Sequence, residues 1–373
     1  MSTVFTKFRR FCTNMDRMED QDRTARPDKP PRALNSEPVM AERAKTRSVL
    51  AISGPKSLSF LNSLTTNELN QLRHDATCLH TFFLNAKGRI IHEALVYSPD
   101  EGDDDGTIFV ECDISSLQAL QTHLIMYRTK TNIEIRSVEQ DVAVWTVFDP
   151  KEIDTFGDES AGGEKKSHNT SFLDNVDLGS DVLSSRDPRM WPLGVRILAP
   201  KDMDVSATLR GAGVKISSSD QTGGNYRMVR YKLGVAEGVA EIGYGRSLPA
   251  EINGDYTNAI SQAKSGYVGW TADGFKATIT RRMLPLRFQG TGAQYAAHLT
   301  PNAPITDRKG KKRAPIGYLR GIQLPVGLGL MHIPSVLVDT HCTVGKMATE
   351  CMRPPWWKPD ARKPAIVAQE MSR

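Results

Sequence analysis

The chain has 373 residues, enough for two or three domains, and its content of 39% hydrophobic and 24% charged residues is typical of an ordinary globular protein. A net charge of +5 gives no reason to expect nucleic-acid binding, and no apolar run approaches the roughly 18 residues of a membrane-spanning helix. The five cysteines are widely spread and include no C-x-x-C pair, which argues against a disulfide framework, a zinc site or an iron–sulfur cluster held by this chain alone.

The first fifteen residues contain three basic side chains and no acid, and as a helix they would place Val4, Phe8 and Phe11 on one face. This pattern is typical of a mitochondrial presequence, although a basic disordered N-terminus has the same composition. Residues 16–45 are polar and proline-rich. We therefore expect a presequence and disordered linker over residues 1–45 and folded structure from about Thr46.

The next hundred residues show short strand and helix signals in alternation. Ser57 is a candidate cap for the first helix, and Asn85 to Gly88 suit a tight turn between two strands. Helices are expected near 57–64 and 117–127. Strands are expected at 48–53, 77–84, 90–97, 107–113 and 142–148.

Residues 149–185 lack apolar periodicity and predict a mobile surface insertion. A strand is expected at 193–198, a helix at 226–233 and another strand at 277–288. Short apolar runs broken by Gly and Pro predict a small β-barrel over 276–350. The tail, 351–373, should pack its tryptophans back on the body.

Several segments, in this order and spacing, are similar to one known family. They are the 53–69 strand–helix unit, the turn FLNAKGRI at 83–90, Asp187-Pro-Arg189 with the LGVR that follows, and YRMVRYKLGVAEG at 226–238. The chain resembles the YgfZ-type family over roughly residues 45–335. Mitochondrial members of this family help mature [4Fe–4S] proteins, and the family is related to the aminomethyltransferase, or T-protein, of glycine cleavage.

The resemblance implies an α+β fold. Two interleaved ferredoxin-like α+β domains would form a folate-type pocket within residues 46–275, and the small C-terminal β-barrel would follow. It also implies a position in the matrix, partnership with A-type iron–sulfur scaffold proteins, and tetrahydrofolate as a possible ligand. An iron–sulfur cluster would be held only together with a partner.

The chain departs from the family signature K-G-C-Y-x-G-Q-E. Lys264, Tyr267 and Gly269 match it, but Gly266 stands where the cysteine would be, so thiol chemistry at that position is excluded. The paired acids of the related transferases correspond here to His92 and Glu93. Their pterin-holding glutamate corresponds to Lys232, which cannot accept hydrogen bonds.

We expect Lys264, Tyr267 and Gly269 to line the ligand pocket, together with Arg89 and Glu93. The simpler interpretation gives Tyr267 a core position and leaves Lys264 and Arg89 solvated. His92 on a strand is more often a structural histidine than a base. No catalytic residue is predicted, and enzymatic activity is left open.

An assembly factor that acts by binding is the function we expect. Two alternatives remain: a folate-dependent aminomethyl transferase, and a degenerate paralogue that keeps the fold as an interaction module.

Overall fold

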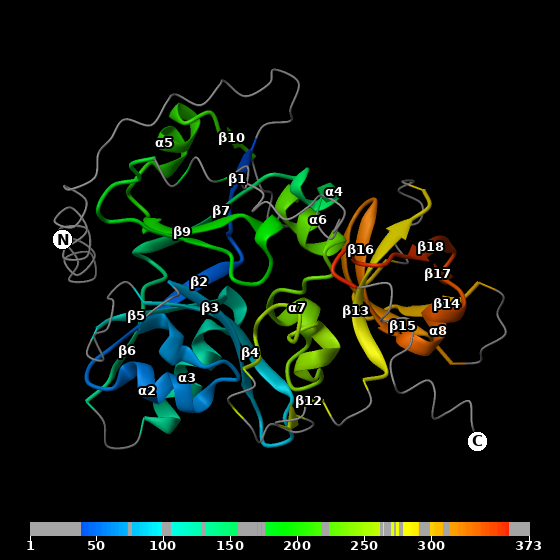
Figure 1. Ribbon diagram of the computed structural model, residues 1–373, viewed down its shortest axis with the longest axis horizontal. Helices are drawn as coiled ribbons and strands as arrows, with labels where there is room; N and C mark the ends of the chain where they lie inside the picture. Colours follow the sequence, from blue (N-terminus) through cyan, green and yellow to red (C-terminus); the bar gives the residue numbers. More distant parts are fainter. Residues whose placement is uncertain are drawn as a thin grey trace.

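The computed structural model contains two five-stranded sheets and a closed barrel (Figure 1). The described residues are 39–73, 77–98, 106–128, 132–155, 170, 173, 176–217, 224–261, 264, 270–271, 274–275, 279–290, 299–308 and 314–357. Within them, no helix is long and apolar enough to span a membrane.

The first sheet has the order β3-β4-β5-β2-β6, and all its neighbouring strands are antiparallel. Helices α2 (Ser57–Leu64) and α3 (Leu117–Tyr127), with the 3-10 turns η1 (Leu69–Arg73) and η2 (Ile114–Ser116), belong to the same part of the chain. The strands are β2 (Arg47–Ser53), β3 (Cys78–Leu84), β4 (Ile90–Tyr97), β5 (Ile108–Asp113) and β6 (Glu134–Ser137). Every residue of β4 is buried, because its two faces join two different apolar clusters.

The second sheet has the order β10-β1-β7-β9-β8. Its strand β1 comes before all strands of the first sheet in the sequence. Met40 of β1 pairs with Phe148 of β7, so the two sheets are interleaved along the chain. Helix α5 (Val205–Gly211) packs on this sheet in one apolar cluster. The strands are β1 (Met40–Arg43), β7 (Val142–Phe148), β8 (Leu183–Arg186), β9 (Val195–Pro200) and β10 (Lys215–Ile216).

Short helices lie within the second α+β unit and between the sheets and the barrel. Helices α6 and α7 lie at the centre of the molecule, between the sheets and the barrel (Figure 1). These elements are α4 (Glu152–Thr155), η4 (Trp191–Leu193), α6 (Gly224–Lys232), α7 (Gly238–Ile242), η5 (Pro249–Ile252) and the small hairpin of β11 (Trp270–Thr271) and β12 (Gly274–Phe275).

The barrel closes in the order β13-β16-β15-β14-β17-β18, around one apolar cluster. Closure pairs both edge strands and so removes exposed strand edges. Its elements are β13 (Arg281–Phe288), β14 (Pro304–Asp307), β15 (Gly317–Gln323), β16 (Val326–His332), α8 (Ile333–Val338), β17 (His341–Val344) and β18 (Met347–Cys351).

The C-terminal tail returns to the body, as the sequence predicted. The ring of Trp356 lies 4.3 Å from that of Tyr256, and its indole N–H donates to the carbonyl oxygen of Leu233 at 2.7 Å. Trp357 packs against the barrel core. The tail therefore connects the barrel to the segment that follows α6.

Several local predictions are wrong. Folded structure begins before Thr46, because residues 40–43 form β1, where a disordered linker was expected. Ser57 does not cap α2: it is the first helical residue, and its hydroxyl donates to the carbonyl of Gly54. The mobile surface insertion was expected to extend to residue 185, but Leu173, Leu178 and Leu183 are buried in the core, so the predicted C-terminal bound is too late. The strand expected at 193–198 lies at Val195–Pro200, after the 3-10 turn η4.

The other expectations of strand and helix position agree with the structure. Strands β4 and β7 have the expected bounds, and the remaining strands and helices differ from expectation by a few residues at most. The predicted architecture, two interleaved α+β units followed by a small barrel, is confirmed.

Candidate functional site

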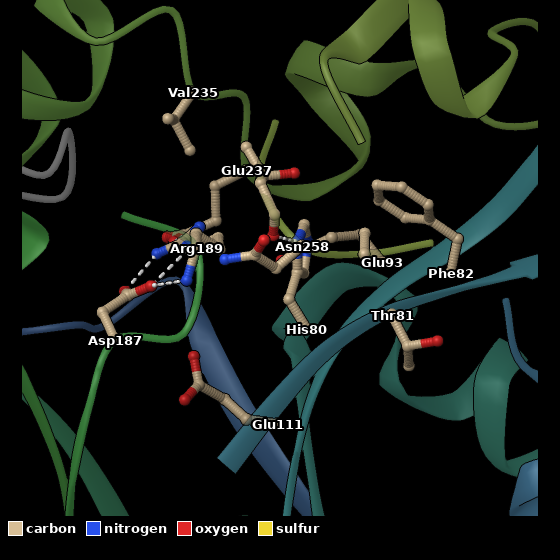
Figure 2. A network of polar contacts seen from close by, with 12 residues as sticks. His80, Thr81, Phe82, Glu93, Glu111, Asp187, Arg189, Val235, Glu237 and Asn258 are labelled. Atoms are coloured by element: carbon tan, nitrogen blue, oxygen red, sulfur yellow. Dashed lines mark hydrogen bonds and ion pairs between the residues drawn. The ribbon is translucent and has the colours of Figure 1, made fainter. Parts of the chain in front are cut away.

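Where the two sheets face each other, the interior contains charged side chains (Figure 2). Strands normally bury apolar residues on such a face, so each charge needs a partner. The cluster has four arginines and five carboxylates, and we call it the central ionic cluster. Its members are Arg47, Arg189, Arg196, Arg230, Glu93, Glu111, Asp187, Glu237 and Glu241.

Glu111 of β5 links the two sheets. Its Oε1 accepts from Arg47 of β2 at 2.7 Å and from Arg196 of β9 at 2.8 Å. Its Oε2 accepts from the hydroxyl of Tyr97 at 2.6 Å. All four side chains are buried, so these charge-assisted bonds form without competition from water.

Asp187 and Arg189, which lie in the D-P-R motif, form the second part of the cluster. The guanidinium donates to both oxygens of Asp187, from Nε at 2.9 Å and from Nη2 at 2.7 Å, and from Nη1 to Glu237 at 2.8 Å. The hydroxyl of Tyr226 donates to Asp187 at 3.1 Å and accepts from Arg196 at 3.1 Å. The motif therefore fixes the loop before β9 onto α6.

The cluster holds Asp187 and Glu93 in the charged form. Burial alone would raise the pKa of Asp187, but Arg189 and Arg196 lower it well below its usual range. Burial would likewise raise the pKa of Glu93, but Arg47 and then His80 lower it to about 2. A carboxylate with so low a pKa is a poor general base at neutral pH.

His80 of β3 is one of the buried polar groups of this region with an unmet hydrogen bond; Nε of Arg230 and the hydroxyl of Thr257 are others. Its Nδ1 lies 3.0 Å from the carbonyl oxygen of Thr257, so Nδ1 carries a proton. Its Nε2 lacks a partner and lies 3.6 Å from Oε1 of Glu93 (Figure 2). A neutral ring would turn a lone pair toward the carboxylate. A donor from a ligand, or a second proton on the ring, would satisfy both groups.

A second feature is a pocket between β4, η2 and α7. His92 lines it, is 2% exposed, and has an Nδ1 without a partner. Burial and then His123 lower the pKa of His92 to about 4, so the ring is neutral. The rings of His123 and Tyr244 each lie 5.9 Å from that of His92, and Tyr127 lies 4.8 Å from His123.

The residues predicted for the ligand pocket occupy different environments. Glu93 lies in the central ionic cluster. The guanidinium of Arg89 donates to the carbonyl of Arg246, after α7. The ammonium of Lys264 donates to the carbonyl oxygens of Asn62 and Thr65 at the end of α2, and burial lowers its pKa to about 8. Lys264 thus caps a helix C-terminus.

The other predicted positions, Gly266, Tyr267 and Gly269, lie outside the described residues. Whether they line a pocket stays a prediction.

Sequence reasoning did not select most of the cluster, including Arg47, Glu111, Arg196 and His80. A usable signal was present: a charged residue inside an otherwise apolar strand, as in Ile108-Phe-Val-Glu111 and Val195-Arg-Ile197. Such a residue must find a buried partner, and that requirement predicts a cluster without saying which partner it has.

The thiols of the described residues are buried and remain protonated. Burial raises the pKa of Cys112 and of Cys342 to about 12, and it raises those of Cys78 and Cys351 as well. Within the same part of the chain, no group of three or more His, Cys, Asp or Glu side chains could hold a metal ion.

Comparison with known proteins identifies similarity over the barrel and over the whole chain. Residues 280–359 match the family model described as the CAF17 C-terminal beta-barrel domain. The chain is 28% identical over 333 residues to the mouse mitochondrial iron-sulfur cluster assembly factor IBA57, covering 85% of each protein. The human protein of that name is 26% identical, with 83% of each chain covered.

A homologue of the same description from the fungus Pyricularia oryzae is 28% identical and covers 78% of this chain and 70% of its own. Among solved structures, the aminomethyltransferase T of the glycine cleavage system from Bartonella henselae superposes with a TM-score of 0.55. It has 13% identity and covers 86% of each chain. The predicted resemblance to the YgfZ-type family and to the aminomethyltransferase fold is confirmed.

Proposed function

We propose that this chain, a YgfZ-type protein with the aminomethyltransferase fold, is an assembly factor that helps mature [4Fe–4S] proteins in the mitochondrial matrix. The observation that carries the proposal is the reach of the similarity. Proteins named as mitochondrial iron-sulfur cluster assembly factors align over 85% and 83% of this chain, so both α+β units and the barrel are included. The acid-free, basic start of the sequence supports mitochondrial targeting.

An A-type scaffold protein that carries the cluster is the partner we propose. Iron in such clusters is bound by thiolates. The buried cysteines of the described residues are protonated, and burial is what keeps them so. The cluster, which is the cargo of the reaction, would therefore depend on cysteines of the partner.

The pocket beside His92 is the surface that we propose for this partner. Tyr244 lines it and is 58% exposed, and Tyr127 of α3, whose ring lies 4.8 Å from that of His123, is 53% exposed. Large apolar side chains gathered at the mouth of a pocket are typical of protein–protein contacts. The unpaired Nδ1 of His92 offers a hydrogen bond to a side chain that enters.

Tetrahydrofolate is the ligand that we propose for the central site. The orphaned Nε2 of His80, beside Glu93, is suited to a donor group of the pterin. The other cluster acids accept from arginines, and Lys232 replaces the carboxylate that holds the pterin in the related transferases. With Glu93 paired to Arg47, binding without aminomethyl transfer is the expected behaviour.

Deletion of the gene in cells, followed by re-expression of the wild-type chain or of a variant, tests the function. Loss of the chain is expected to lower aconitase activity and protein lipoylation, and the wild-type chain should restore both. Unchanged activities in the knockout would overturn the proposal. The paired substitution Tyr127→Ala/Tyr244→Ala should fail to restore them, whereas Tyr318→Ala, a similarly exposed tyrosine on the barrel, should succeed.

Calorimetric titration with tetrahydrofolate tests the ligand separately. Wild-type protein is expected to bind, and His80→Ala to bind at least tenfold more weakly because the orphaned nitrogen is removed. Equal affinity of the two proteins would place the ligand elsewhere. Turnover with an aminomethyl donor would instead favour the transferase alternative.

A further inference from the structure

Three arginines converge where α7 and η5 meet the barrel. Arg246 follows α7, Arg281 begins β13 and Arg320 lies on β15. A β-carbon placed on Gly243 would lie 3.5 Å from Nη1 of Arg320 and 3.6 Å from Cδ of Arg246, so these two side chains flank the same point. This group, Arg246, Arg281 and Arg320, is called the barrel arginine cluster below.

The carboxylate of this region, that of Glu251, already has hydrogen-bond partners on both oxygens. Oε1 of Glu251 accepts from Arg281 at 2.9 Å and 2.7 Å, and Oε2 accepts from the backbone N–H of Leu248 at 2.9 Å. Among the described residues, one carboxylate is thus shared by three guanidinium groups, and it pairs directly with Arg281, so Arg246 and Arg320 have no ion-pair partner there.

Arg320 is the most buried of the three, with 9% of its surface exposed. Its Nη1 donates to the neutral amide oxygen of Asn302 at 2.7 Å, and its Nε has no hydrogen-bond partner. Burial, followed by repulsion from Arg246 and Arg281, lowers the pKa of Arg320. A guanidinium nevertheless stays protonated in proteins, so the charge cannot be shed.

A partly desolvated cation of this kind is stabilised by an anion. Water can satisfy the N–H group but does not neutralise the charge, and Asn302 is uncharged. Guanidinium groups bind the oxygens of phosphate and carboxylate with planar, often bidentate hydrogen bonds. We propose that the barrel arginine cluster is a binding site for an oxyanion, a phosphate or carboxylate group, which donors of Arg320 and its neighbours hold.

This site is separate from the central ionic cluster and does not depend on the proposed function. In the central cluster every arginine pairs with a carboxylate of the chain itself. In the barrel cluster none of the carboxylates that the structure describes pairs with Arg320.

The site is tested by thermal unfolding and by calorimetry. One arm uses inorganic phosphate and a second arm uses glutarate, and each is compared with sodium chloride at equal ionic strength. The wild-type chain is expected to gain thermal stability in at least one arm beyond that in chloride. Arg320→Gln should bind the active anion at least tenfold more weakly. Arg287→Gln is the matched control, because Arg287 lies on β13 and pairs with Glu350. It should respond like wild type and so cancel general salt effects.

The arm that responds identifies phosphate or carboxylate as the ligand group, and a response in either supports the proposal. An equal response of Arg320→Gln and wild type, or a wild-type response no larger than in chloride, would overturn it. If Arg320→Gln does not fold, Arg246→Gln replaces it, because Arg246 is exposed and its loss leaves the core intact. It should weaken anion binding by roughly threefold to tenfold, in line with the loss of one exposed charge. Unchanged binding by this variant would count against the site.

Discussion

The central ionic cluster and the barrel arginine cluster both bury arginine, but they treat its charge in opposite ways. In the first, Arg196 donates to Glu111 and to Glu237, and Arg189 donates to Asp187 and Glu237. In the second, Arg320 meets only a neutral amide. A buried guanidinium that the chain neutralises itself is a structural link, whereas one left without an acid is available to a ligand.

The central ionic cluster also shows that buried charged groups can stabilise a fold. In the central cluster the acids Glu93 and Glu237 are paired with arginines. Pairing keeps these acids ionised and fixes the two sheets together. A site that is specialised for stability in this way has few groups left for proton transfer.

Glu111→Gln should have the largest effect on the paired cluster. It removes the carboxylate charge that Arg47 and Arg196 share, so that two buried guanidinium groups lose one of their acid partners while Arg47 keeps Glu93 and Arg196 keeps Asp187 and Glu237. We expect a loss of about 3–5 kcal/mol in the free energy of unfolding, measured by urea denaturation. A loss below about 1 kcal/mol would show that the sheets do not depend on this link.

Acid should destabilise the same cluster. The pKa of Glu93 is about 2 in the folded chain against 4.5 when unperturbed, so its stabilisation is complete above about pH 5 and is lost as pH falls toward 2. The shift corresponds to roughly 3 kcal/mol. Urea midpoints measured from pH 6 to pH 3 should fall steeply for wild type and less steeply for Glu93→Gln. Parallel curves for the two proteins would contradict the assignment.

Gly321→Ala should produce a smaller effect and probes the contact between the two regions. A β-carbon at this position would lie 2.0 Å from the hydroxyl oxygen of Tyr231, which donates to Glu241. We expect a loss of about 2 kcal/mol, since a buried aromatic ring must shift. In a Tyr231→Phe background, which removes the nearest clashing atom but keeps the ring carbon Cζ at 2.4 Å, the same substitution should cost somewhat less. An equal cost in both backgrounds would locate the strain elsewhere.

Arg136→Gln is expected to have the smallest effect. Arg136 and Asp141 form an ion pair at 3.3 Å, but 41% and 33% of their side-chain surfaces are exposed. Such a pair contributes less than about 1 kcal/mol because water screens it. Urea denaturation of this variant gives the baseline for Glu111→Gln. A loss as large as that of Glu111→Gln would remove the distinction between buried and exposed pairs.

Much of the fold was predictable from local patterns. Short segments rich in apolar residues, such as Ile90–Tyr97, predicted strands, and the recurrence of Leu117, Leu120 and Leu124 predicted α3, because each pattern depends only on neighbours in sequence. β1 was missed for the opposite reason. Four residues, MAER, carry no strand signal, and their pairing with β7 depends on a segment distant in sequence.

The candidate site was predictable only in part. The resemblance selected Glu93 and drew attention to the D-P-R motif, but it could not show that arginines from β2 and β9 meet between the sheets. Lys264 was expected to meet a ligand, and that stays a prediction; the structure shows that its long side chain reaches the free carbonyl groups at the end of α2. The unpaired state of Arg320 was not visible at all, since a missing partner is a property of three-dimensional packing.

The interleaving of the two sheets affects how the chain can fold during synthesis. β1 leaves the ribosome before any strand of the first sheet, but its partners β7 and β10 follow only after that sheet is complete in sequence. The first α+β unit can therefore fold while β1, which precedes it in the sequence, still has no paired strand. Any maturation cut that removes residues 40–43 would leave the edge of β7 open to other strands, so processing must end before Met40.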